Sequence, residues 1–163
     1  MYKRFIAGVL ALAVSMLTFA VQSATPSPIY KQSVNLPMDG VYTAVYQALE
    51  EARFYVVLEP NIGKNAARFA DKWGDEYNTN KLQHIRSMVF CNIWYANAVG
   101  NADPDMLALC PLRIGMYEKN GKTTVVFARP TVMAAQSPAK SILEEVEAQV
   151  VAAIKVGINS AKK

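Results

Sequence analysis

The spacing of apolar residues divides the chain after residue 24 into elements of ordinary globular length. Alternating side chains over residues 29–36 predict a first strand. An apolar stripe at helical spacing over 41–52 predicts a helix, for which Asp39 offers an N-cap. The β-branched and aromatic run 54–58 then predicts a second strand. The chain therefore opens as strand, helix, strand.

The middle of the chain is less regular. Residues 61–73 place apolar side chains on one side of a helix, whereas 75–83 are polar and irregular. Residues 88–91 predict a short buried strand, and a helix over 93–102 follows it directly. The pair Asp103-Pro104 ends this helix, because proline removes a backbone donor.

The clearest local signal is the dipeptide Asn120-Gly121 between two strand-like runs, 112–118 and 123–128. Asparagine and glycine tolerate the positive φ angles of a type I′ turn. The two runs are therefore predicted to pair as an antiparallel hairpin.

A final helix is predicted after Ser137-Pro138, an N-cap followed by proline at the first helical position. Acidic residues early in this helix and Lys155 late match the helix dipole. Its apolar stripe needs a surface to cover, and a sheet face is the natural one. The pattern thus predicts an α+β fold: a two-layer sandwich with helices packed on one face of a mostly antiparallel sheet. The stripe consists of Leu143, Val146, Val150, Ala153, Ile154 and Ile158.

Residues 1–24 have the pattern of a cleavable signal peptide. Lys3 and Arg4 precede an uninterrupted, largely apolar run over 5–21, and a Pro-Ser-Pro spacer follows at 26–28. We expect cleavage after Ser23 or Ala24 and a periplasmic or secreted protein. An uncleaved anchor helix is the alternative, but the run is short and rich in alanine for a membrane span.

The remaining residues, 25–163, are enough for one domain with its own core. The formal charge of +4 falls to +2 without Lys3 and Arg4, and the basic residues are scattered. This distribution argues against nucleic acid and anionic lipid as partners. Charges interrupt every apolar run after residue 24, so we expect no membrane span in the mature chain.

Several motifs resemble the bacterial domain-of-unknown-function family 302, and the resemblance covers nearly all of 25–163. It implies a compact α+β domain with helices on an antiparallel-rich sheet. Because the family name assigns no activity, it leaves the function open. The motifs are Ala-Leu-Glu-Glu-Ala-Arg-Phe at 48–54, Phe-Cys-Asn at 90–92, Asp-Pro at 103–104 and Leu-Cys-Pro-Leu-Arg at 109–113.

Catalytic motifs are scarce. His84 is the single histidine, and no Gly-x-Ser-x-Gly elbow or phosphate-binding glycine loop occurs. The carboxylate pairs Glu50-Glu51 and Glu144-Glu145 are explained by solvated helix faces. The sequence therefore favours a protein that is not an enzyme, and it identifies no cofactor.

The two cysteines, Cys91 and Cys110, are the residues in this sequence that could form a reactive or metal-binding site. They are predicted at neighbouring strand ends and hence close in space. In an oxidising compartment they would form one disulfide, worth roughly 3 kcal/mol for a loop of about twenty residues. They would otherwise be free packing thiols, or a functional site of redox-active thiols or of a soft metal. The further metal ligands considered are Met88, Met106, Met116 and His84.

Polar and aromatic neighbours suggest a small pocket around the cysteines. Its candidates are Cys91, Asn92, Trp94, Cys110 and Arg113. Two hypotheses follow. The first is a non-catalytic binding or accessory protein, whose pocket near Cys91, Asn92 and Cys110 takes an unidentified small molecule or protein. The second is a thiol-dependent redox or soft-metal-handling protein. A homodimer formed through a sheet edge is compatible with either.

Overall fold

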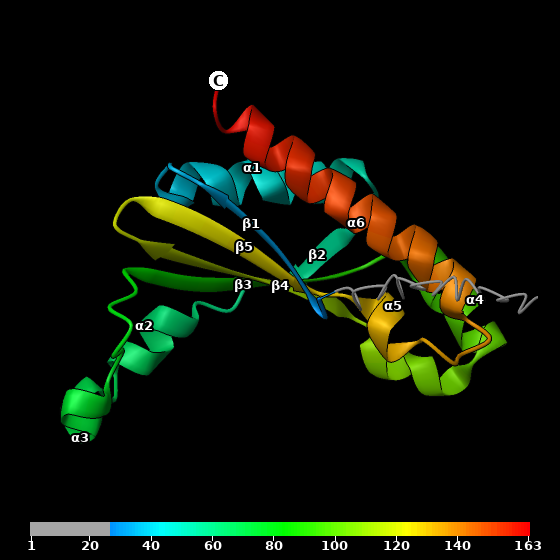
Figure 1. Cartoon of the computed structure of the whole chain (residues 1–163), viewed down its shortest axis with the longest axis horizontal. Helices are drawn as coiled ribbons and strands as arrows, with labels where there is room; N and C mark the ends of the chain where they lie inside the picture. The colour runs from blue at the N-terminus through cyan, green and yellow to red at the C-terminus, as the bar shows by residue number, and fades with distance from the viewer. Residues whose placement is uncertain (1–26) are drawn as a thin grey trace, which may run out of the picture.

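The structure is a computed structural model that describes residues 27–163, so the predicted signal peptide lies outside the described residues. Five strands form one sheet in the order β1-β5-β4-β3-β2, and every neighbouring pair is antiparallel (Figure 1). The strands are β1 (Ile29–Val34), β2 (Tyr55–Leu58), β3 (His84–Cys91), β4 (Leu112–Lys119) and β5 (Lys122–Ala128).

Two long helices, α1 (Met38–Glu51) and α6 (Lys140–Ser160), lie side by side on one face of the sheet (Figure 1). This arrangement confirms the predicted α+β fold with helices on an antiparallel sheet. Within residues 27–163, no helix has the length and apolarity needed to cross a membrane. The shorter elements are α2 (Ile62–Ala67), α3 (Ala70–Trp73), η1 (Gly74–Glu76), α4 (Ile93–Ala102), η2 (Pro104–Leu109) and α5 (Pro130–Met133).

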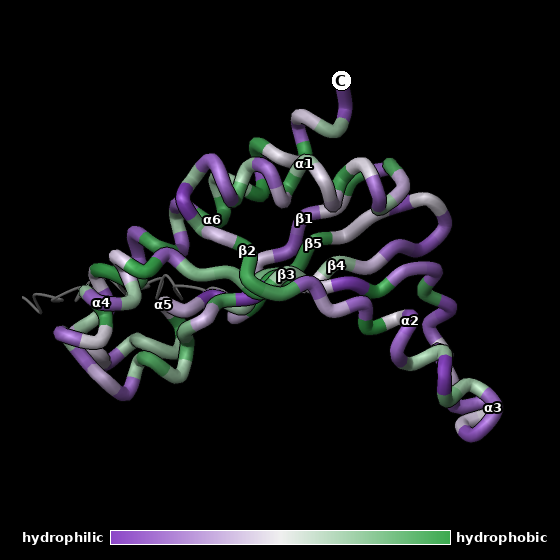
Figure 2. Tube along the Cα trace, turned by 180° about the vertical axis from the view of Figure 1, so that it is seen from behind, coloured by the Kyte–Doolittle hydropathy of each residue, from purple (hydrophilic) through white to green (hydrophobic). Residues whose placement is uncertain are grey.

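The main core lies between the sheet and the two long helices. Along these helices hydrophobic and hydrophilic residues alternate at helical spacing (Figure 2). The apolar side of each helix is buried against alternate residues of the strands. Burying one large apolar side chain contributes about 1.5–3 kcal/mol, so this layer holds the fold together. Its fully buried members include Val45, Leu49, Phe90, Ile114, Phe127 and Ile154.

The hairpin prediction is confirmed. Asn120 has φ 52° and Gly121 φ 70°, between β4 and β5. Replacing Gly121 by valine should lower the free energy of unfolding by about 1 kcal/mol or more, because a β-branched residue is strained at positive φ. Urea denaturation measures this change. The matched control is Asn120→Gly, which should not destabilise the protein. An unchanged urea midpoint for Gly121→Val would contradict the proposed strain.

Both predicted helix caps are wrong. Pro37 takes the N-cap position of α1, and Asp39 lies in the first turn. The backbone N–H of Met38 instead donates to Glu118 Oε2 of β4 at 2.7 Å. In α6 the N-cap is Ala139, while Ser137 Oγ accepts from the Ala139 N–H, outside the helix. A single side chain distant in sequence, Glu118, accepts a hydrogen bond from the first turn of α1, and no local pattern reveals it.

The predicted helix over 61–73 is divided, and the strand predicted at 88–91 is longer. Helix α2 ends at Ala67 and α3 is a separate short helix. Strand β3 begins at His84, because its polar first half pairs with β4 in register, His84 opposite Glu118. Tertiary pairing therefore extends a strand whose own sequence is only half apolar.

Candidate functional site: a paired-thiol pocket

The two cysteines meet at one end of the sheet. Cys91 is the last residue of β3, and Cys110 directly follows η2, just before β4. Because β3 and β4 are neighbours, paired at Phe90 and Leu112, the ends that carry the cysteines are adjacent. The Sγ atoms are 3.5 Å apart, and both residues are half-buried free thiols. The structure thus brings together the pair that the strand positions predicted.

The thiols line a small apolar pocket closed by α4, η2 and α6. The cavity volume is about 30 Å³, enough for roughly two water molecules. Among residues 27–163, no charged side chain lines this pocket. The walls include Phe54, Val99, Met106, Leu109, Leu143 and Val146.

The surroundings hold Cys110 in its neutral form. Burial foremost, and then the hydrogen bond and charge of Cys91, raise the pKa of the Cys110 thiol to about 11. At neutral pH this thiol is protonated. A thiol acts as a nucleophile only after losing its proton, so Cys110 is inert in the absence of a group that displaces the proton.

Asn92 lines the same pocket, but its side chain has a structural task. Asn92 is the N-cap of α4, and its Oδ1 accepts from the N–H groups of Trp94 and Tyr95 at 3.0 and 3.3 Å. An asparagine cap of this kind typically stabilises a helix by about 1 kcal/mol. Its carbonyl oxygen is therefore already engaged by the helix.

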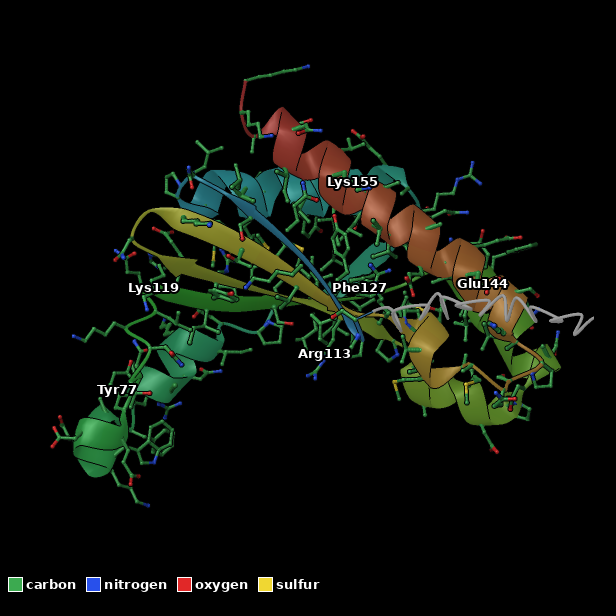
Figure 3. All side chains as sticks on the ribbon, viewed as in Figure 1. Tyr77, Arg113, Lys119, Phe127, Glu144 and Lys155 are labelled. Atoms are coloured by element: carbon green, nitrogen blue, oxygen red, sulfur yellow. The ribbon has the colours of Figure 1, made fainter. Side chains whose placement is uncertain are left out.

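Trp94 and Arg113 lie apart from the thiol pocket. The Trp94 side chain is 71 % exposed, on the first turn of α4. Arg113 follows Leu112, which lines the pocket, and side chains alternate along a strand. Arg113 accordingly points away from the two long helices, to the opposite side of the sheet (Figure 3).

Of the other metal ligands considered, only Met106 lines the pocket. His84 is exposed at the far end of β3 from Cys91, roughly 23 Å away in an extended strand. Met88 and Met116 are buried in the main core. Within residues 27–163, no three or more His, Cys, Asp and Glu residues gather as a metal cluster.

Sequence reasoning missed the walls that the last helix contributes. Leu143 and Val146 belong to the predicted stripe of α6, but they close the thiol pocket. Tyr95 of α4 also lines the pocket. Its ring stacks on Phe54 at 6.2 Å, and its hydroxyl accepts from Gln149 Nε2 of α6 at 2.5 Å. The apolar stripe of α6 in the sequence does not show which of its residues cover the sheet and which close the thiol pocket.

A five-stranded antiparallel sheet with two long helices on one face and a thiol pair at its end defines the class as a small α+β domain. The chain belongs to the family Domain of unknown function DUF302, whose model matches residues 30–156. This match confirms the resemblance found in the motifs.

Among solved structures, the chain is similar to the uncharacterized conserved protein DUF302 from Bacillus stearothermophilus. The two share 20 % sequence identity with a TM-score of 0.68, and the match covers 80 % of this chain and 98 % of the other. At this identity the likeness shows the fold. No curated protein matches the chain.

Proposed function

We propose that the protein is an exported, non-catalytic binding protein that holds one soft metal ion, Cu(I), between Cys91 and Cys110. The observation that carries this proposal is the 3.5 Å separation of the two Sγ atoms at the wall of an apolar pocket. Export is supported by the signal-peptide pattern of residues 1–24.

The surroundings of the thiols argue against redox catalysis. A catalytic dithiol needs an attacking thiol whose pKa lies near ambient pH. Burial instead raises the pKa of Cys110 to about 11. Within the described part of the chain, no histidine, lysine or arginine lines the pocket to stabilise a thiolate. These surroundings therefore favour metal binding by the two thiols over electron transfer.

The size and the donors of the pocket argue for a single soft ion. An organic ligand needs a pocket of about 300 Å³ or more, whereas the space here is about 30 Å³. The sulfur groups available are the two thiols and the thioether of Met106. Thiolate and thioether ligands favour Cu(I). A structural zinc site would need four nitrogen, sulfur or oxygen ligands, which the pocket lacks.

A disulfide between the same residues is the second candidate. The separation of 3.5 Å is close enough for the sulfurs to bond after a small movement, and exported proteins meet oxidising conditions. The two thiols would give up two protons and two electrons to an external oxidant. Such a bond would contribute roughly 3 kcal/mol of stability.

Copper competition distinguishes these candidates. The reduced protein, kept free of oxygen, is titrated against a coloured Cu(I) chelator. We expect one Cu(I) per chain, and a loss of affinity of at least about 100-fold for Cys91→Ser or Cys110→Ser, because hydroxyl is a poor ligand for a soft ion. Met106→Leu should weaken binding about tenfold, in the range of lost supporting contacts at metal sites.

The matched control is Met133→Leu, because Met133 is 65 % exposed and does not line the pocket. This variant should bind Cu(I) as the wild type does. Reduced wild-type protein that takes no Cu(I), or serine variants that bind it equally well, would overturn the proposal. Thiols that resist alkylation until a reductant is added, in protein as isolated, would establish the disulfide.

A further inference from the structure

One face of the sheet is largely open. Helices α1 and α6 cover the other face, and on this side α2 packs only over part of β3, where Gly63 contacts Ile85 (Figure 1). We call the open side the uncovered face. A shallow apolar groove crosses it, lined by Ile29, Ile62, Gly115 and Val126 among others.

The charged residues that the strands place on the uncovered face are all cationic. Strand alternation and register put Lys31, Arg113, Lys119 and Lys122 on this side, and all four are exposed. No strand contributes a carboxylate to it, and none of the described ion pairs includes these four residues. Four of the basic residues that are scattered along the sequence thus share one face of the sheet.

The segment 69–77, here called the arm tip, has the opposite character. It projects away from the sheet in the views of both Figure 1 and Figure 2. Phe69, Trp73 and Tyr77 form a stack with ring centroids 5.5 and 6.3 Å apart, and Phe69 and Trp73 remain 48 % and 43 % exposed. The arm tip carries three exposed carboxylates, Asp71, Asp75 and Glu76, and one exposed cation, Lys72.

We infer that two copies of this chain form a clasped dimer, in which the arm tip of each docks on the uncovered face of the other. The acidic tip then meets the cationic face, and the exposed aromatic stack covers the apolar groove. The tip of one chain points away from its own face, so a second copy must supply the contact (Figure 1). A two-fold axis makes this contact twice, which doubles the area buried.

Charge complementarity favours a second copy of this chain as the partner. The uncovered face and the arm tip carry opposite charges, and electrostatic complementarity of this kind selects the partner of an interface. The cationic uncovered face and the acidic, aromatic arm tip complement each other, so one isologous contact provides a partner for both. An unrelated acidic protein would leave the aromatic stack of the tip exposed.

Charge reversal tests the dimer directly. Protein expressed from the full sequence is studied by analytical ultracentrifugation across the micromolar range. The face variant is Lys31→Glu with Arg113→Glu, and the tip variant is Asp75→Lys with Glu76→Lys. We expect a wild-type dimer and two monomeric variants, with dimer dissociation constants raised at least about 100-fold by like charges facing each other.

Mixing the two variants is the decisive step. The face variant replaces two of the four face cations by carboxylates and keeps its acidic tip, whereas the tip variant keeps its cationic face and carries a cationic tip, so the introduced charges meet opposite charges only in the mixed pair. We expect the equimolar mixture to regain the dimer, which also shows that both variants are folded. A monomeric wild-type protein would overturn the proposal. If that monomer binds a soluble polyanion through Lys31 and Arg113, the uncovered face serves another acidic partner. If the face variant and the tip variant each remain dimeric when studied separately, the clasped dimer is wrong and the chains pair at a sheet edge instead.

Discussion

Replacement of Gly157 by alanine is expected to lower the free energy of unfolding by about 2–3 kcal/mol, although alanine is the better helix former. Gly157 of α6 packs against the backbone of α1. A Cβ atom at this position would lie 2.5 Å from Val45 Cα and 2.8 Å from the Ala44 carbonyl oxygen. Backbone atoms cannot rotate away, so the two helices would have to separate. Their separation would loosen the layer that covers the sheet.

Urea or thermal unfolding measures the effect, with Gly40→Ala as the matched control. Gly40 lies in α1, and a Cβ atom there would meet nothing within 4 Å. Alanine at position 40 should therefore stabilise the protein by about 0.5–1 kcal/mol. A Gly157→Ala protein as stable as the wild type would show that the helices do not meet at this point.

The affinity of the reduced protein for Cu(I) is expected to fall at least about tenfold for each pH unit below neutrality. Cu(I) binds the thiolate, and binding must displace the proton of Cys110. Because burial raises the pKa of this thiol to about 11, the thiolate is scarce at pH 7 and scarcer still at pH 6. Each pH unit of acidification lowers the fraction of Cys110 thiolate tenfold, so protons compete with the metal throughout this pH range.

Chelator competition at pH 6, 7 and 8, corrected for the protonation of the chelator, measures this slope. Cys110→Ser provides the control, since its hydroxyl carries no competing proton in this range. The variant should bind more weakly and with a flatter pH profile. An affinity that is the same at all three pH values would exclude Cys110 as a ligand.

Much of the fold could be predicted because several elements carry their own local signals. The turn at Asn120-Gly121 and the helix over 93–102 agree with the structure. The start of α1 could not be predicted, because Glu118, 80 residues away, accepts from its first turn. The first half of β3 was missed for a similar reason: its pairing with β4 outweighs its polar sequence.

Only the part of the candidate site that lies at the ends of strands could be predicted from the sequence. Cys91 and Cys110 were expected to be close because their strands were expected in one sheet, and they lie in contact. Arg113 was grouped with them by nearness in sequence, but one residue along a strand reverses the direction of a side chain. Trp94 was grouped with them for its aromatic character, and the α4 turn leaves it exposed.

Export and copper binding are tested together by native mass spectrometry of the protein recovered, without added oxidant or chelator, from the compartment in which it resides. We expect a chain that starts between residues 21 and 26, with one copper ion in place of the two thiol protons. A chain that still begins at Met1, or a reduced chain that takes up no Cu(I) when the ion is supplied, would contradict this expectation.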